Sequence, residues 1–132
     1  MTSVLVRHAS AGKRADWGRD DRLRPLDARG RRQAAALVEL LRVVAVRRVV
    51  SSPYVRCLET VEPLAAALGL AIEEDDSLAE GAGTAASALL AEVGLVACTH
   101  GDVAEELLGY GLKTGAAVVV RDGRVVQEIP AP

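Results

Sequence analysis

Short apolar runs alternate along the chain with longer stretches in which apolar residues recur at helical spacing. This alternation predicts an α/β fold, because strands buried on both faces are continuously apolar and helices usually connect parallel strands. Two further runs flank Arg121-Asp122-Gly123-Arg124, and an Asp-Gly pair between apolar runs is typical of a β-hairpin. The expected strands cover residues 3–6, 48–51, 70–72, 95–98, 116–120 and 125–129.

The expected helices lie between these strands. The clearest follows Asp27, a good N-cap residue, and keeps its apolar residues on one face up to Leu41. A second carries Pro63, which lacks a backbone donor, so a kink or a break is expected there before Gly69 caps the helix. The expected helices cover residues 28–41, 55–68, 84–93 and 101–108, and the expected loops include a long polar one at 9–26 and an acidic one at 73–83.

These elements predict a three-layer α/β/α sandwich with a mainly parallel sheet and an antiparallel hairpin at its C-terminal edge. The 132 residues are expected to form one domain, 1–132. Only 2% of the residues are aromatic, which argues against a nucleic-acid site built on base stacking. No secretion signal or membrane span is expected, so we expect a cytoplasmic protein in which Cys57 and Cys98 are buried structural thiols.

Charge is distributed unevenly along the chain. Residues 1–60 carry 13 Lys and Arg against 6 Asp and Glu, whereas residues 61–132 carry 3 against 12. Of the 16 basic residues 14 are Arg, the side chain best suited to binding phosphate or carboxylate through two hydrogen bonds. The pattern favours an anionic ligand, although a solvated surface with an ordinary charge imbalance explains the count equally well.

Polar side chains follow the expected parallel strands where each of them ends. Arg7 and His8 follow the first strand, Arg56 follows the second, Glu80 lies in the loop after the third and His100 follows the fourth. Ligands of such sheets bind beyond the carboxyl ends of the strands. Two guanidinium and two imidazole groups at one point suit a phosphoryl group, because arginine binds its oxygens and neutralises the charge of the transition state.

One neutral imidazole at this edge would attack phosphorus, since neighbouring arginines disfavour its protonation. A carboxylic acid such as Glu80 would protonate the leaving oxygen. A zinc site made by both histidines with Cys98 or Asp102 is an alternative, but the arginines would repel a cation, so no metal is expected. Neither cysteine begins the C-x5-R loop of cysteine phosphatases, because Pro63 and Ala104 stand at the arginine position.

Four short blocks of residues support this chemistry by a resemblance. In chain order they are Arg7-His8-Ala9, Arg24-Pro25-Leu26-Asp27-x-x-Gly30, Ser51-Ser52-Pro53-x-x-Arg56-x-x-x-Thr60 and Thr99-His100-Gly101. They resemble the Arg-His-Gly, Arg-Pro-Leu-Thr, Ser-Ser-Pro and Ser-His-Gly blocks of the histidine phosphatase superfamily, which is phosphoglycerate-mutase-like. Length and the Arg-Pro-Leu segment are most similar to the short SixA-type phosphohistidine phosphatases. The chain is also similar to the histidine-phosphatase domain attached to some Nudix hydrolases.

The resemblance implies a role for each matched residue. His8 would be the nucleophile that forms a phosphohistidine, with His100 beside it. Glu80 matches the acid of many relatives, an acid that the short branch often lacks. Asp102 is either a substitute acid or a helix cap. The residues implied to bind the phosphoryl group are Arg7, Arg24, Arg56 and His100.

The expected function is therefore a metal-independent phosphatase that needs no cofactor and acts through a covalent phosphohistidine. Its substrate would be a phosphorylated small molecule or a phosphohistidine protein. No nucleic-acid or membrane partner is expected, and the sequence leaves the oligomeric state open. The alternative is a non-catalytic phosphate- or nucleotide-binding module of the same fold. A mutase is disfavoured, because it needs a more enclosed site than a chain of this length readily builds.

Each assignment also has a purely structural interpretation. A histidine at a strand end is often only a hydrogen-bonding residue, and Arg56 would pair with Glu59 or Glu62 along its own helix. Glu80 belongs to an acidic loop that is equally consistent with a solvated surface. Four basic residues of the polar loop are expected to be surface charges rather than ligands of the phosphoryl group. They are Lys13, Arg14, Arg19 and Arg22.

Overall fold

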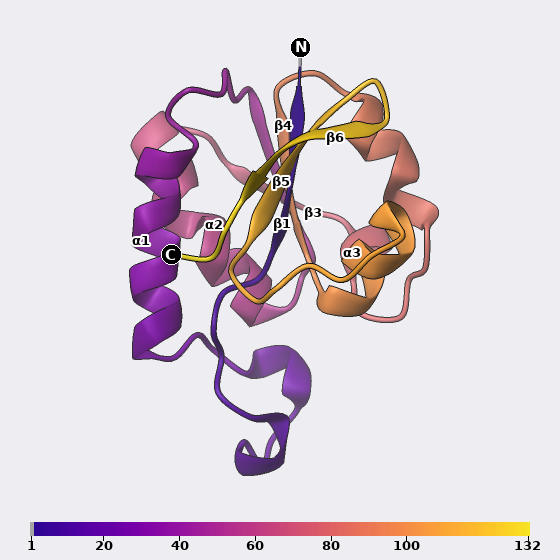
Figure 1. The fold of residues 1–132 in the computed structure, drawn as a ribbon. Coiled ribbons are helices and arrows are strands. Elements are labelled where there is room, and N and C mark those ends of the chain that lie inside the picture. Colours follow the sequence, from indigo (N-terminus) through magenta and orange to yellow (C-terminus); the bar gives the residue numbers. More distant parts are fainter. Residues whose placement is uncertain (1) are drawn as a thin grey trace.

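The computed structural model describes residues 2–132, which form a six-stranded sheet between two helical layers (Figure 1). The strands lie in the order β3-β2-β4-β1-β5-β6. β1, β2, β3 and β4 are parallel, and β5 and β6 form an antiparallel hairpin at one edge, which confirms the expected fold class. The strands are β1 (Ser3–Arg7), β2 (Arg48–Ser51), β3 (Ile72–Glu74), β4 (Leu95–Thr99), β5 (Ala117–Arg121) and β6 (Arg124–Ile129).

Helices cover both faces of the sheet, and the alternation of side chains along each strand divides the core in two. Val4 and Val6 pack in the cluster that α1 and α2 complete, whereas Leu5 packs on the opposite side with α3, η3 and η4. Both clusters are aliphatic, as the scarcity of aromatic residues requires. The bounds are α1 (Ala28–Leu40), α2 (Val55–Leu68), α3 (Gly101–Leu108) and the 3-10 helices η3 (Asp76–Leu78) and η4 (Ala85–Ala91).

The third strand begins two residues later than the sequence pattern predicts. Gly69 ends α2 as expected, but the N–H of Leu70 still donates to the carbonyl oxygen of Ala65 at 2.9 Å, so Leu70 belongs to the end of the helix. Pairing with β2 starts at Ile72. The acidic Glu73, expected in a loop, instead lies on this edge strand and forms an ion pair with Arg48 at 2.8 Å.

Two helical predictions also need correction. The stretch expected to be an α-helix at 84–93 is the 3-10 helix η4, in which the N–H of Ser87 donates to Thr84 three residues earlier. Three residues per turn place Ala86 and Leu89 on one side, where they join the core. Of the kink or break expected at Pro63, a break is excluded: α2 runs across this residue, because buried residues on both sides of it hold the helix against the sheet.

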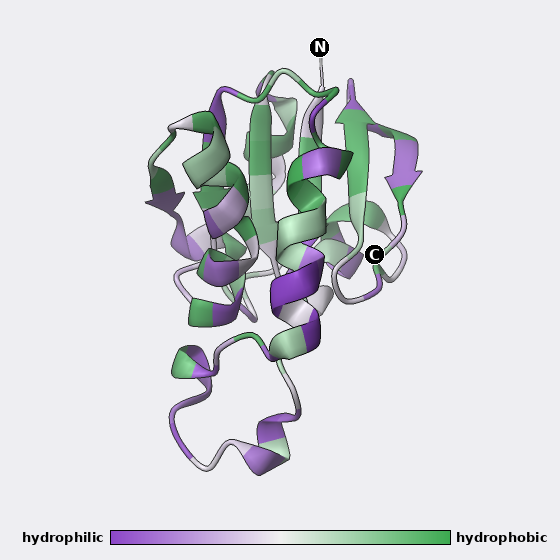
Figure 2. Cartoon of the chain, turned by 90° about the vertical axis from the view of Figure 1, so that its left-hand side faces the viewer, coloured by the Kyte–Doolittle hydropathy of each residue, from purple (hydrophilic) through white to green (hydrophobic). Residues whose placement is uncertain are grey.

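The polar segment 9–26 extends from the body of the molecule at the end of the sheet where β1 finishes (Figures 1 and 2). It is less irregular than expected, because it contains the 3-10 helices η1 (Arg14–Asp16) and η2 (Asp21–Leu23). Figure 2 shows that most of this segment is hydrophilic, in contrast to the strands. Within residues 2–132, every helix is too short or too polar to span a bilayer.

Asp27 fixes the base of this segment to the start of α1. Its Oδ1 accepts the N–H of Gly30 at 2.8 Å, which is the predicted N-cap. Its Oδ2 accepts the Ser10 hydroxyl at 2.7 Å and the N–H of Gly12 at 3.1 Å. A Cβ at Gly30 would overlap the carbonyl oxygen of Ser10, so this contact requires the glycine of the second block.

Candidate active site

Main-chain hydrogen bonds bring three of the four blocks to one edge of the sheet. The N–H of His8 donates to Thr99 at the end of β4, and the N–H of Ser52 donates to Cys98, each at 3.0 Å. The carbonyl of His8 accepts the N–H of Gly115 at 2.9 Å, so His8 is held on both sides. The rings of His8 and His100 consequently lie 5.5 Å apart, centroid to centroid.

His8 is held as a neutral imidazole with one nitrogen free. Its Nδ1 lies 2.8 Å from the carbonyl oxygen of Ala9, which can only accept, so Nδ1 carries the hydrogen and Nε2 the lone pair. The pKa of His8 is lowered from 6.5 to about 3, chiefly by burial, against the opposing effect of the Ala9 hydrogen bond. The charges of Arg56, His100 and Arg7 contribute to the same lowering. This is the protonation state that a nucleophile needs.

His100 is oriented by groups behind its ring. It is 1% exposed, its Nε2 lies 2.9 Å from the Ser52 hydroxyl and 3.6 Å from the Cys57 sulfur, and Tyr54 packs edge-on against it at 4.6 Å. Cys57 is, as predicted, a buried free thiol, as is Cys98, whose pKa burial raises. The structure thus leaves only Nδ1 of His100 available for a ligand.

Arg7 lies flat against the backbone at the start of α3. Its Nη1 donates to the carbonyl of Leu112 at 2.8 Å. A Cβ at Gly101 would come within 2.8 Å of the guanidinium carbon of Arg7, so only glycine permits this approach. The glycine of the fourth block therefore positions the arginine of the first.

Arg56 comes from the first turn of α2, and its side chain is 1% exposed. The Thr60 hydroxyl donates to the carbonyl of Arg56 at 2.6 Å and accepts the N–H of Ala9 at 2.9 Å, which ties this turn to the loop of His8. Among residues 2–132, three buried side-chain nitrogens have no hydrogen-bond partner: Arg7 Nε, Arg56 Nε and His100 Nδ1. Buried polar atoms are normally paired, so three such atoms around His8 point to a ligand that accepts hydrogen bonds.

Asp21 is the site residue that the sequence did not reveal. Arg56 does not pair with Glu59 or Glu62; its Nη2 donates to Asp21 Oδ2 at 3.0 Å. Burial raises the pKa of Asp21, but the hydrogen bond from Arg24 and the charges of Arg56, Arg24 and Arg14 outweigh it and lower the pKa below its ordinary value. The only sequence signal was its i, i+3 spacing to Arg24, which helical ion pairs share.

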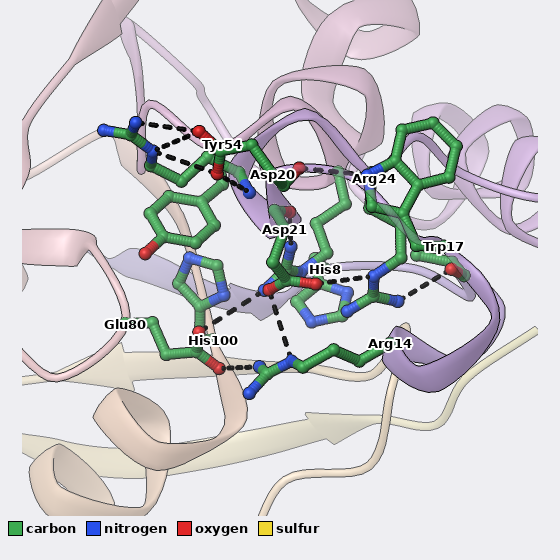
Figure 3. Close-up of polar contacts among 12 residues, drawn as sticks. His8, Arg14, Trp17, Asp20, Asp21, Arg24, Tyr54, Glu80 and His100 are labelled. Atoms are coloured by element: carbon green, nitrogen blue, oxygen red, sulfur yellow. Dashed lines mark hydrogen bonds and ion pairs between the residues drawn. The ribbon is translucent and has the colours of Figure 1, made fainter.

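Glu80 lies at the same edge and is paired with two arginines. Its Oε1 accepts a hydrogen bond from Arg14 Nη2 at 2.6 Å (Figure 3). Its Oε2 lies 3.6 Å from Arg56 Nη2. Arg14 was expected to be a surface charge; its side chain is 61% exposed, yet it also lies 3.4 Å from Asp21 and so links the two carboxylates. Asp102 accepts the N–H of Gly81 at 2.7 Å, which ties the loop of Glu80 to α3.

Arg24 is held rigidly at the opposite side of His8 from Glu80 (Figure 3). It is 8% exposed, and its Nη1 donates to the carbonyl of Ala11 at 2.7 Å. Arg24, Arg7 and His8 line one cavity of about 280 Å³. No three His, Cys, Asp or Glu side chains of residues 2–132 are grouped so that they would hold a metal ion. The cationic set around a neutral imidazole suits a tetrahedral anion instead.

Sequence comparison with known proteins finds a matching family and a related mycobacterial protein. A model of the histidine phosphatase superfamily (branch 1) matches residues 3–94. The 8-oxo-(d)GTP phosphatase of Mycolicibacterium smegmatis is 35% identical over 125 residues, which are 95% of this chain and 35% of that protein. The chain therefore spans about a third of the length of this relative.

Solved structures share the fold at lower identity. The protein histidine phosphatase SixA in complex with tungstate has a TM-score of 0.81 and 22% identity, covering 99% of this chain and 97% of that one. The phosphoserine phosphatase of Entamoeba histolytica with 3-phosphoglyceric acid has a TM-score of 0.72 and 13% identity, covering 97% and 96%. The family model matches well over half of the chain, including the first three blocks, and the fourth block follows the matched residues. The chain belongs to the histidine phosphatase superfamily, branch 1.

Proposed function

We propose that the chain is a phosphatase that transfers a phosphoryl group to His8 and then to water. One observation carries this proposal: the three buried nitrogens without a partner belong to Arg7, Arg56 and His100, which the sequence assigns to phosphate binding. They surround an imidazole that is neutral and whose Nε2 has its lone pair free. Hydrogen-bond donors fixed around a nucleophile are the arrangement that stabilises the charge of a phosphoryl transition state.

In the first step, Nε2 of His8 forms a bond to phosphorus as the bond from phosphorus to the leaving oxygen breaks. The electron pair of that bond goes to the leaving oxygen, while Arg7, Arg56 and His100 hold the other oxygens. Nδ1 keeps its hydrogen throughout, because the Ala9 carbonyl holds it. In the second step, water attacks the phosphohistidine, and its two hydrogens leave on dihydrogen phosphate as His8 returns to its neutral form.

Glu80 is the proposed acid for substrates whose leaving oxygen needs a proton. Its carboxylate reaches Arg56, one of the expected phosphate ligands. Asp21 lies in the same cluster, but its lowered pKa keeps it ionised and makes it a poor proton donor. Asp21 is therefore assigned a different role, as a carboxylate that occupies donors of Arg56 and Arg24 until a phosphoryl group binds.

Two substrate classes fit this chemistry. The SixA-like fold supports a protein phosphohistidine, and a short chain suits an open site. The relative named 8-oxo-(d)GTP phosphatase supports a phosphorylated small molecule of the nucleotide type. The excess of arginine around His8 supports a reaction that needs no bound metal, since a cation would be repelled there.

Turnover of p-nitrophenyl phosphate in excess chelator tests the proposal. We expect turnover by the wild type and by the control Arg32→Gln, which alters an exposed arginine of α1, and none by His8→Asn. Binding of phosphate without turnover by the wild type would instead support the non-catalytic module. Loss of all activity in chelator would refute the metal-independent mechanism.

A trapping experiment locates the covalent step. Rapid quenching during turnover of radiolabelled substrate should give a base-stable, acid-labile label, as expected of a phosphohistidine. The label should be absent from His8→Asn and map to the peptide that contains His8. A label on a serine or cysteine peptide would overturn the mechanism.

A further inference from the structure

The cavity of about 280 Å³ beside His8 extends from Arg7 to Arg29 in the first turn of α1. The part beyond His8 would receive the leaving group of the substrate. Within residues 2–132 no aspartate or glutamate lines this cavity, although acidic residues lie close by. Polar side chains that line it include Arg7, His8, Ser10, Arg24, Arg29 and Thr114.

Arg29 contributes a positive charge that also acts on Asp27, whose pKa it lowers. It is exposed in the first turn of α1, and it takes part in no ion pair within the described residues 2–132. Asp27 precedes it by two residues, but both oxygens of that carboxylate already accept hydrogen bonds from Ser10, Gly12 and Gly30. Asp27 therefore does not occupy the hydrogen-bond donors of Arg29, which lines the cavity and can offer them to an anion there.

Arg24 contributes a second, rigid group of donors on the same wall. Its Nε is bound by Asp21 at 2.9 Å, and its Nη1 by the carbonyls of Ala11 and Gly12 at 2.7 and 3.2 Å. These contacts fix the plane of the guanidinium and leave Nη2 for a ligand. A guanidinium that is already oriented loses little entropy when it binds an anion.

We infer that Arg24 and Arg29 form a second anion subsite, and that the substrate is a diphosphate whose terminal phosphoryl group goes to His8. This inference rests on the proposed function. The bond between the terminal phosphorus and the bridging oxygen breaks, and its electron pair leaves on a phosphate monoester dianion that Arg24 and Arg29 hold. His8 gains the phosphoryl group as a zwitterion with its Nδ1 hydrogen in place, so charge balances without a proton donor.

The state of the nearby carboxylates agrees with this substrate class. Asp21 is ionised and bound by Arg24 and Arg56, and Glu80 is paired with Arg14. Because phosphate is a good leaving group, a diphosphate needs no acid from either of them. In a phosphohistidine side chain, in contrast, the leaving imidazole carries no negative charge, so Arg24 and Arg29 would not stabilise it.

Inhibition by two non-hydrolysable phosphonates tests the subsite. Methylenediphosphonate carries both anionic groups, and methylphosphonate carries only one. Both are measured as inhibitors of p-nitrophenyl phosphate turnover by the wild type. We expect the inhibition constant of methylphosphonate to exceed that of methylenediphosphonate by a ratio of about ten or more. Arg29→Gln should bring this ratio close to one, whereas Arg32→Gln, an equal charge change on the exposed side of the same helix, should preserve it.

A ratio of the two inhibition constants near one in the wild type would overturn the subsite. An equal fall of this ratio in Arg29→Gln and Arg32→Gln would overturn it as well. Turnover gives a second result: a nucleoside diphosphate should be hydrolysed with a higher kcat/KM than phosphohistidine peptides, and the reverse order would contradict the inference. If p-nitrophenyl phosphate is not hydrolysed at all, the proposed function is refuted and the subsite is not. The ratio of the two phosphonate affinities is then measured by calorimetry, which still decides the subsite.

Discussion

Arg56 holds Asp21 through two hydrogen bonds: its Nη1 donates to the main-chain oxygen at 2.8 Å and its Nη2 to Oδ2 at 3.0 Å. Arg24 donates to the other carboxylate oxygen at 2.9 Å. A carboxylate therefore binds two of the guanidinium groups for which the family resemblance implies phosphate binding. Since carboxylate and phosphate bind arginine in the same way, Asp21 and an incoming phosphoryl group compete for these donors.

Asp21→Asn should consequently raise the affinity of the site for anions. Removing the negative charge frees Arg56, and we expect the inhibition constant of tungstate or inorganic phosphate to fall about tenfold, equivalent to ~1.4 kcal/mol. Inhibition of p-nitrophenyl phosphate turnover measures it. Asp20→Asn is the control, because Asp20 is bound by Arg22 and not by Arg56. A higher inhibition constant in Asp21→Asn would show that Asp21 positions Arg56 rather than competing with the ligand.

His8 should remain neutral throughout the physiological pH range. Burial and the surrounding positive charges lower its pKa to about 3, so its ring should not titrate between about pH 5 and 8 in the free protein. Nuclear magnetic resonance of the two histidine rings measures this directly, and the spectrum of His100→Asn assigns them. A bound oxyanion adds negative charge and should raise the pKa of His8. A midpoint near 6.5 without ligand would contradict the burial that the structure shows.

The same shift predicts how acid affects stability. The unfolded chain, with a histidine pKa of 6.5, binds more protons than the folded chain down to the folded pKa of about 3. The contribution of His8 to the free energy of unfolding is therefore present above pH 6.5 and is lost as the pH falls toward 3. Between pH 7 and 5 this loss is about 2 kcal/mol. Urea unfolding at both pH values measures it. His8→Asn should lose correspondingly less, and an equal loss would rule out His8 as the source.

The arrangement of the site follows from features that can be predicted from a sequence, namely the strands and the residue types that follow them. Strand register places the residues that follow each parallel strand at one edge, so the meeting of His8 and His100 depends only on the identification of β1 and β4. The blocks also support one another: the Thr60 hydroxyl binds the carbonyl of Arg56 within the third block, and Gly101 of the fourth block leaves room for Arg7 of the first. Both contacts join residues of the blocks themselves, which strand register already brings together.

The polar segment 9–26 could not be interpreted in the same way, because it has no apolar period that fixes its direction. Two of its charged residues bind partners that are distant in the sequence: Arg14 binds Glu80, and Asp21 binds Arg56. Which acid pairs with which arginine depends on where η1 and η2 lie, and spacing alone does not determine that. The start of β3 was misplaced for a related reason, because Leu70 completes the end of α2 instead of entering the sheet.

Glu80→Gln should slow the hydrolysis of alkyl phosphates far more than that of aryl phosphates. An alkoxide leaving group needs a proton and an aryl one does not, so loss of the acid should lower kcat/KM for alkyl esters about a hundredfold. Aryl phosphate turnover should change by less than about threefold. Glu74→Gln, at the end of β3, is the control. Equal slowing of both classes would remove Glu80 from the acid role and leave it only its ion pairs with Arg14 and Arg56.

Gly101→Ala should impair the binding of Arg7 to the phosphoryl group with little change in the fold. The new Cβ would come within 2.8 Å of the guanidinium carbon, and the guanidinium must move because the other side of this contact is helix backbone. We expect kcat/KM for p-nitrophenyl phosphate to fall about tenfold or more, while urea unfolding changes by about 1 kcal/mol or less. Gly111→Ala adds the same methyl group where no atom lies within 4 Å, so it should leave activity unchanged. If Gly101→Ala keeps full activity, Arg7 does not need its observed position, and its role as a phosphate ligand is refuted.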